Sequence, residues 1–182
     1  MTIDAILEIA ATLLGLGFLI GVIQRKIWSW PMGTLSSGLS VVLFYRFGLY
    51  AETGLYVLYV IMGFYGWWMW SNKGQEGEIQ LVDYPWVKQW WSLLGIPAAI
   101  LLGYFLNQLH GVSFAYFDAF TSTFAIIATW QETRRIRTAF HYWIPLNIAT
   151  MILYGAKGLW VYAALMLVYS VMSVVGFLNW RK

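Results

Sequence analysis

The chain has 182 residues, of which 60% are hydrophobic, 19% aromatic and 10% charged. Ordinary soluble domains carry about 25% charged residues, so a soluble domain of this size could not bury so much apolar surface, and the expected solvent is lipid. The net charge of +3 comes without a dense Lys/Arg patch, which argues against nucleic-acid binding, and the lack of cysteine excludes disulfides and thiolate metal sites.

Seven apolar stretches follow one another along the chain. A bilayer core of about 30 Å requires roughly 20 helical residues, so each stretch is a predicted membrane span. The first begins with Asp4 and Glu8, where a signal peptide would be basic, so we expect it to be retained. Ser71–Tyr84 is the one polar linker, and we expect a single transmembrane domain. The stretches are Asp4–Ile23, Trp28–Phe47, Tyr50–Trp70, Trp86–Leu106, Ser113–Gln131, Phe140–Gly155 and Gly158–Trp180.

Basic residues are distributed unevenly between the two sides that these spans define. With the N-terminus outside, nine of the 11 Lys and Arg residues fall on the cytoplasmic side, against Arg46 and Lys157 outside. Cytoplasmic loops carry the excess of positive charge, so the sequence predicts an external N-terminus and a cytoplasmic C-terminus. The nine are Arg25, Lys26, Lys73, Lys88, Arg134, Arg135, Arg137, Arg181 and Lys182.

One stretch of the chain occurs twice, 110 residues apart. Gly48–Trp70 lies on Gly158–Trp180 without a gap and with seven identities in 23 positions, where chance gives roughly two. Transporter folds are commonly built from such repeats, with the site between them. Three helices per repeat is an odd number, so a fourth helix must reverse the chain for both repeats to enter the membrane in the same sense. We therefore predict a 3+1+3 parallel repeat, with repeat 1 at about 4–70, a linker helix at about 86–106 and repeat 2 at about 113–180.

Polar side chains within the predicted spans share single helical faces. In the sixth stretch Trp143, Asn147, Thr150 and Tyr154 recur at helical spacing around Pro145. Such groups are costly in a membrane and indicate a ligand path. Close helix packing, anchoring at the membrane interface and, for Asn147, repair of the backbone beside Pro145 are the alternatives. Similar faces are Glu52, Tyr56, Tyr59, Gly63, Gly66 and Trp70 in the third stretch, and Tyr162, Tyr169, Ser173, Gly176 and Trp180 in the seventh.

Both repeats place an acid and a polar group at matching positions. At the 110-residue offset, Glu8 corresponds to Asp118 and Ser37 to Asn147. Asp118 lies near the end of its stretch, where a solvated helix cap is the alternative to a functional role. An aromatic box with an amide, hydroxyls and one or two acids suits a flat heterocycle, either cationic or neutral, because ring faces attract cations and the amide reads a polar edge.

Several motifs are similar to those of one transporter family. They are Trp30-Pro31, Gly48-Leu49-Tyr50-Ala51, Tyr65-Gly66-Trp67 with Trp70, Asp118, the W-x3-N pair Trp143 and Asn147, Gly158-Leu159, and Gly176 with Trp180. Over nearly the whole chain the sequence resembles the PnuC-type nicotinamide riboside transporter family. The resemblance implies a bacterial inner-membrane vitamin transporter with a 3+1+3 fold akin to that of SWEET proteins, acting as a homotrimer by facilitated diffusion while a cytoplasmic vitamin kinase traps the substrate.

One departure leaves the vitamin open. Many nicotinamide riboside members of the family carry a Gln and an Asn in the third span, where this chain has Tyr56 and Gly63. The same family has a thiamine-transporting branch, so thiamine is the alternative substrate; both are cationic heteroaromatic compounds with a hydroxylated part.

We therefore expect a transporter for a cationic B-vitamin, with no cofactor, metal or catalytic residue. The aromatic side chains would stack on the ring, Asn147 would read its polar edge, and Asp118 would attract the cation near the outer mouth. The predicted site residues are Trp143, Asn147, Tyr154, Tyr59, Tyr169, Asp118, Trp67 and Ser37.

Two other classes of function are alternatives. A membrane-embedded enzyme would need a catalytic set around His141, and a structural subunit would need no site at all; uptake of labelled vitamin into liposomes separates all three. Ion coupling would require a buried acid or His within a span. Because Glu8, Glu52, Asp118 and Glu132 all lie within about two turns of a predicted span end, we expect a uniporter.

Overall fold

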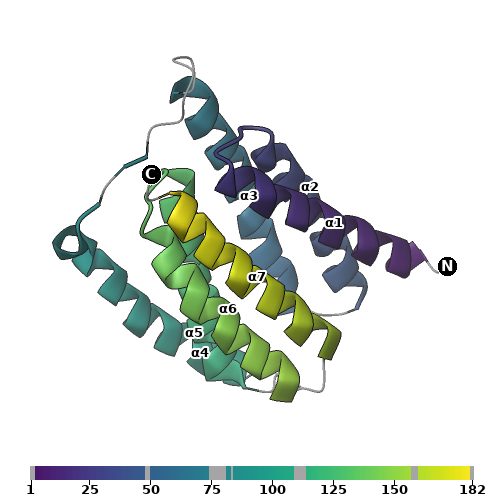
Figure 1. The fold of residues 1–182 in the computed structure, drawn as a ribbon. Coiled ribbons are helices and arrows are strands. Elements are labelled where there is room, and N and C mark those ends of the chain that lie inside the picture. The colour runs from purple at the N-terminus through teal and green to yellow at the C-terminus, as the bar shows by residue number, and fades with distance from the viewer. Residues whose placement is uncertain are drawn as a thin grey trace. The chain divides into compact units, whose positions relative to one another are not determined.

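The computed structural model describes residues 3–47, 50–73, 81–82, 84–108, 114–156 and 160–180. In these ranges the chain forms seven α-helices, each on one of the predicted stretches, which confirms the all-α fold class (Figure 1). Two compact units contain them, Met1–Gln80 with the first three helices and Leu81–Lys182 with the other four. The helices are α1 (Ile3–Ile23), α2 (Ser29–Arg46), α3 (Tyr50–Lys73), α4 (Gly95–Asn107), α5 (Ala115–Thr133), α6 (Ala139–Ala156) and α7 (Trp160–Asn179).

The fourth stretch differs from the single helix that the sequence predicts. Trp86–Leu94 forms a 3-10 helix, η1, and the α-helix begins at Gly95. Pro97 lies in the first turn of α4, where its missing N–H is tolerated. An α-helix running through from Trp86 would need that N–H to bond the carbonyl of Leu93, so the α-helical pattern starts just before the proline.

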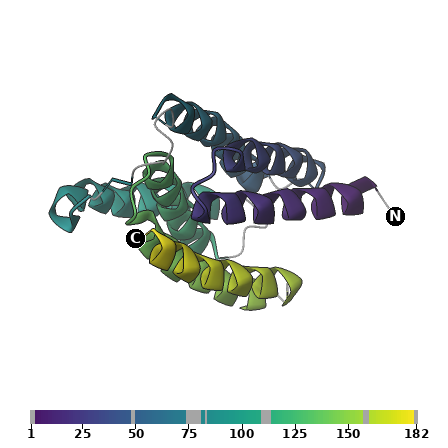
Figure 2. The same ribbon diagram turned by 45° about the horizontal axis from the view of Figure 1, so that its top comes forward.

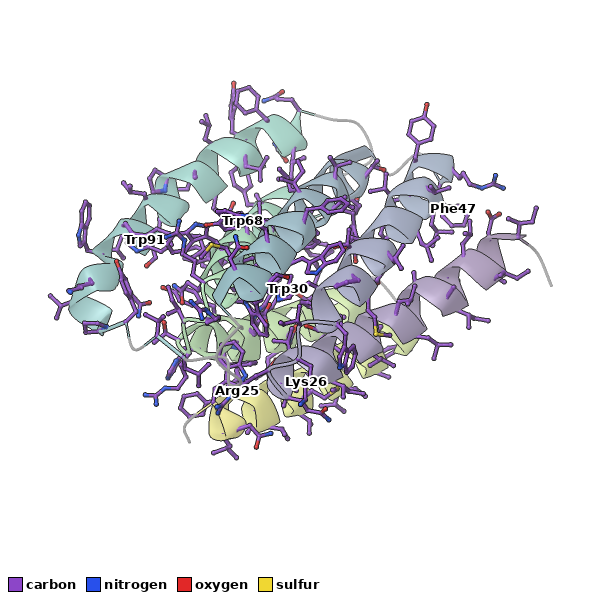
Figure 3. The ribbon with its side chains drawn as sticks, turned by 90° about the horizontal axis from the view of Figure 1, so that it is seen from above. Arg25, Lys26, Trp30, Phe47, Trp68 and Trp91 are labelled. Carbon is purple, nitrogen blue, oxygen red and sulfur yellow. The ribbon has the colours of Figure 1, made fainter. Side chains whose placement is uncertain are left out.

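In the first unit, α2 packs against both α1 and α3 (Figures 1 and 2). Trp30 of α2 lies at the centre of this packing with 1% of its surface exposed, and Figure 3 labels it. Its ring meets Phe18 of α1 edge-on at 5.5 Å and Trp70 of α3 at 5.4 Å. A Cβ added at Gly66 would run into the Trp30 ring, so α3 approaches α2 closely because residue 66 has no side chain.

In the second unit, α5 packs against α4 and α6, and α6 packs against α7. Phe140 of α6 meets Trp180, just after α7, at 4.9 Å and 88° between the ring planes, and both are buried. Phe140 and Trp180 stand 110 residues after Trp30 and Trp70, whose rings cross at 73°. The second and third helices of each repeat therefore cross at an equivalent aromatic pair.

The turns that precede these pairs are also equivalent. Arg25, between α1 and α2, has φ 58°, and Arg135, between α5 and α6, has φ 62°. Arg25 N donates to Val22 O at 2.9 Å and Arg135 N to Glu132 O at 2.9 Å. Lys26 N bonds Gly21 O at 2.8 Å, and its counterpart Ile136 N bonds Gln131 O at 2.9 Å. Both turns thus end a helix with one left-handed residue whose neighbours satisfy the last carbonyls; Figure 3 labels Arg25 and Lys26.

Large apolar side chains are exposed on every helix, among them Leu13, Leu35, Ile61, Leu101 and Ile152. Two of the described helices are long and apolar enough to cross a membrane by length and composition, Ile3–Ile23 with mean hydropathy 2.3 and Val87–Asn107 with 1.4. The other helices carry more Gly, Ser, Thr, Trp and Tyr, which lower their mean hydropathy. These are the residue types that membrane helices place at their contacts and interfaces.

Candidate functional site

The clearest polar contact between two helices of the predicted site joins α6 to α7. The Asn147 amide Nδ2 donates to Ser173 Oγ at 3.0 Å, and the two residues are 7% and 2% exposed. Pro145 lies within α6 without ending it. The Asn147 amide therefore hydrogen-bonds the neighbouring helix. This contact argues against the alternative that the amide serves only to repair the backbone at Pro145. An amide has two N–H donors and an acceptor oxygen, so the bond to Ser173 uses one part of its capacity.

Trp143 lies one turn before Asn147 and is half-buried. Glu132, whose side chain is 2% exposed, lies in the last turn of the neighbouring helix α5. Asn147 connects α6 to α7 through a side-chain hydrogen bond. The sequence singled out Trp143 but treated Glu132 as one acid near a span end among several.

Tyr169 of α7 lies on the other side of the Asn147–Ser173 contact. The register of α6 and α7 is fixed by the pairs Phe140 with Trp180 and Asn147 with Ser173. In this antiparallel register Tyr169 lies one turn, about 6 Å, from Ser173 in the direction away from Trp143. Tyr169 is half-buried, like Trp143. An indole and a phenol thus flank the amide along the helix axes.

Asp118 lies in the first turn of α5, half-buried. It precedes Glu132 by 14 residues, which is about 21 Å along the helix, so it stands at the opposite end of α5. The Tyr154 backbone continues the α6 face, but its side chain lies outside the described residues. Of the predicted residues in the second unit, Trp143 and Tyr169 thus lie about one helical turn to either side of the Asn147–Ser173 contact along α6 and α7.

The remaining predicted residues, Tyr59, Trp67 and Ser37, belong to the first unit. Tyr59 meets Tyr56 edge-on at 5.5 Å, and Ser37 is half-buried on α2. Trp67 is 43% exposed, whereas Gly63, Gly66 and Trp70 of the predicted α3 face are buried. A Cβ at Gly63 would run into Thr34 Oγ1, just as one at Gly66 would run into Trp30. For these glycines the alternative reading, close helix packing, is the correct one.

Comparison with known proteins identifies the chain. A family model described as "Nicotinamide mononucleotide transporter" matches residues 5–182.

The chain belongs to this transporter family.

Relatives and a solved structure agree with the family model. The "Nicotinamide riboside transporter PnuC" of Neisseria mucosa is 29% identical over 194 aligned positions, covering 98% of this chain and 73% of that protein. The protein of the same name from Escherichia coli is 20% identical, covering 86% of this chain and 77% of its own. A solved structure, "Crystal structure of the Vitamin B3 transporter PnuC", matches with a TM-score of 0.73 and 28% identity over 98% of this chain and 82% of its own. Membership makes the chain a multi-pass transporter of the inner membrane.

The transporter also contains a polar cluster that sequence reasoning missed. Thr138 Oγ1 donates to Gln131 Oε1 at 2.9 Å, Gln89 Nε2 donates to Thr138 Oγ1 at 3.1 Å, and Tyr142 Oη donates to Gln89 Oε1 at 3.3 Å. Gln131 Nε2 in turn donates to Gln89 Oε1 at 3.4 Å, which completes the cluster. Gln89 and Gln131 are 42 residues apart in the sequence. The one feature that could have indicated their contact is that both are polar and lie near the ends of predicted spans.

This cluster ties the start of η1 to the α5–α6 turn of the transporter. The Val82 N–H donates to Arg135 O at 3.0 Å, and Val82 pairs with Ile136 in an isolated parallel bridge. Arg135 is 5% exposed, and burial lowers the pKa of its guanidinium. Among the residues that the structure describes, no group of three or more His, Cys, Asp or Glu side chains could hold a metal ion.

Proposed function

We propose that the transporter takes up nicotinamide riboside, the vitamin that its relatives are named for. Support comes above all from the Asn147–Ser173 pair with Trp143 and Tyr169 on either side of it. Nicotinamide riboside has a flat cationic ring with an amide substituent and a hydroxylated sugar. Indole and phenol faces attract such a ring by about 0.5–2 kcal/mol each, and the unused donor and acceptor of Asn147 match the ligand's amide.

The first unit makes thiamine the second candidate. Gly63 stands where many nicotinamide riboside members have an amide, and its contact with Thr34 leaves no room for a side chain without a shift of α2. The amide chemistry of the proposed site therefore rests on Asn147. Ser37, Tyr59 and Trp67 are the first unit's proposed contribution, Tyr154 extends the α6 face, and Asp118 attracts the cation at the outer end of α5.

We further propose the 3+1+3 parallel-repeat arrangement, with α4 reversing the chain between repeat 1 (about 4–70) and repeat 2 (about 113–180). The equivalent turns at Arg25 and Arg135 and the equivalent pairs Trp30–Trp70 and Phe140–Trp180 support a duplicated unit. The N-terminus would lie outside and the C-terminus in the cytoplasm. A homotrimer and metabolic trapping by a cytoplasmic vitamin kinase complete the proposal.

Binding and uptake by the purified protein in proteoliposomes test the function. Labelled nicotinamide riboside should enter vesicles and be displaced by the unlabelled compound. Nicotinamide mononucleotide should compete poorly, since its phosphate brings roughly −1.5 to −2 charges towards the acidic side chain of Asp118. Stronger competition by thiamine would reassign the substrate. Uptake of none of the three would refute the proposal, and chemical conversion of the substrate would support the enzyme alternative.

A further inference from the structure

Gln89 of η1 uses every hydrogen-bonding position of its side-chain amide. Its Nε2 atom carries two N–H groups and donates to Tyr84 O at 3.0 Å and to Thr138 Oγ1 at 3.1 Å. Its Oε1 atom accepts from Tyr142 Oη at 3.3 Å and from Gln131 Nε2 at 3.4 Å. An amide can donate two bonds and accept two, and Gln89, which is 3% exposed, makes all four. Few positions in a chain determine both the residue type and its orientation so completely.

The α5–α6 turn offers partners for this amide that the α1–α2 turn does not have. In the first unit, a Cβ at Gly21 would run into the Trp28 ring, so the repeat covers this glycine with a side chain of its own. At the 110-residue offset, Gln131 replaces Gly21 and Thr138 replaces Trp28. These two polar side chains bond each other at 2.9 Å, and Gln89 bonds both. A residue of the linker thus completes the turn of the second repeat.

The backbone before η1 is attached to the same turn. The Val82 N–H donates to Arg135 O at 3.0 Å, and Val82 and Ile136 form a parallel bridge. Val82 is seven residues before Gln89, so the segment meets the turn at two separate points. One contact is made by the backbone and the other by a side chain, so both the path of the segment and its rotation about its own axis are fixed.

The 3-10 geometry of η1 gives it one face for the protein and another for its surroundings. A 3-10 helix has three residues per turn, so residues three apart lie directly above one another. Gln89 and Ser92 form one such row and are buried. Val87, Trp90 and Leu93 form another and are exposed. The polar row faces the α5–α6 turn through Gln89, and an α-helical pitch would spread both rows around the helix.

We propose that these contacts form a clamp that keeps η1 on the α5–α6 turn while the transporter changes conformation. Alternating access moves parts of a transporter against one another, whereas a buried polar network with all its partners present is rigid. The start of the linker is then a fixed part of the second repeat throughout transport. The inference holds for whichever vitamin is carried. The clamp comprises Gln89, Gln131, Thr138, Tyr142 and the Val82–Ile136 bridge.

Covalent closure of the clamp tests whether it ever has to open. The chain has no cysteine, so Val82→Cys combined with Ile136→Cys introduces a single pair, at bridged positions that suit a disulfide. Uptake of labelled nicotinamide riboside into proteoliposomes is measured after oxidation and again after reduction, with Val82→Cys alone as the control for oxidation. The two rates should agree within about twofold, since linking parts that stay together hinders no conformational step. A loss of uptake on oxidation that reduction restores would overturn the proposal.

Hydrogen exchange of the full-length protein gives a second readout that needs no substrate. Gln89→Leu should speed exchange of the backbone amides in both 84–94 and 131–142 by about tenfold, because losing the buried network makes local opening easier. Thr138→Val keeps the shape of the side chain and should act on the same two segments, but less. Gln108→Leu is the matched control, since this glutamine is exposed directly after α4, and it should exchange like the wild type.

The exchange pattern decides the proposal even if a variant or the substrate fails. Faster exchange in only one of the two segments of Gln89→Leu, or in neither, would overturn the clamp. Should Gln89→Leu not fold, the same criterion applies to Thr138→Val. Loss of protection in the wild type on addition of nicotinamide riboside would show that the clamp opens and would also overturn it. If the wild type takes up no nicotinamide riboside, the proposed function falls, and the two variants still decide whether the clamp exists.

Discussion

The two repeats share their turns and aromatic crossings but differ where their first two helices meet. In the first unit, Gly17, Gly21 and Gly33 let α1 and α2 approach, since a Cβ at any of them would run into a side chain of the opposite helix. At the same places the second unit has Ile127, Gln131 and Trp143. The first crossing is closed by close packing at these glycines, whereas Gln131 at the second belongs to the buried hydrogen-bond cluster with Gln89 and Thr138.

On the proposed parallel repeat, the difference places the inter-helix hydrogen bond of the proposed site in the second copy. Both units have the features that fix the backbone. These are the left-handed residues Arg25 and Arg135 and the buried ring pairs that follow them. The side chains between these features differ between the two units, while the turn has the same backbone conformation in both. Polar groups in a membrane protein must bond one another, so they appear together in the second unit, as Asn147–Ser173 does where the first has Ser37 and Gly63.

The largest expected effect is all-or-none and tests whether the two turns face the same side of the membrane. Lys26 and Arg134 are exposed in the two equivalent turns, and the chain has no natural cysteine. Lys26→Cys and Arg134→Cys should both react with a membrane-impermeant maleimide from the cytoplasmic side and be protected from outside. Labelling from opposite sides would rule out a parallel repeat. A reporter fused after Lys182 should likewise behave as cytoplasmic.

The next largest effect concerns the polar pair between α6 and α7. Asn147→Leu removes the donor to Ser173 and the proposed ligand amide, which costs about 1–3 kcal/mol, or roughly 5- to 150-fold in affinity. Ser37→Ala, at the matching place in α2, removes one neutral hydroxyl and should cost only about twofold. Titration calorimetry and uptake measure both, with melting in detergent as the test of folding. Equal losses of affinity in Asn147→Leu and Ser37→Ala would mean that the two repeats contribute equally to substrate binding.

A smaller effect follows from exchanging the ring between the helices of the first unit. Gly33→Trp should lower stability by about 1–3 kcal/mol, because the new side chain meets the Phe18 ring. Adding Phe18→Ala, which alone costs about 3–5 kcal/mol, should recover part of that loss by copying the Ala128 and Trp143 arrangement. Thermal melting of the single and double variants measures the coupling. Strictly additive losses would show that the two crossings are not equivalent.

The sequence predicted the helices because they depend on local periodicity. Seven stretches of helical length and an offset of 110 residues required no knowledge of neighbours. Periodicity also placed Asn147 and Ser173 on faces, but it could not say which face of one helix meets which face of another. For that reason the hydrogen-bond cluster that joins Gln89 to Gln131 and Thr138 was missed. Similarly, the polar face of α3 proved to be packing at Gly63 and Gly66, since glycine suits a ligand path and a close contact alike.

The smallest expected effect is none at all, and it concerns ion coupling. A proton-coupled transporter needs an acid that changes charge as its surroundings change. Glu132 is the strongest candidate, because it is buried and the matching residue of the first unit is Val22. It lies in the last turn of α5, at the end of its span, and we expect uniport. Substrate in sealed proteoliposomes should reach the outside concentration and stop there, with or without a proton or sodium gradient. A plateau that a proton gradient raises in the wild type but not in Glu132→Gln would contradict uniport and make Glu132 the coupling residue.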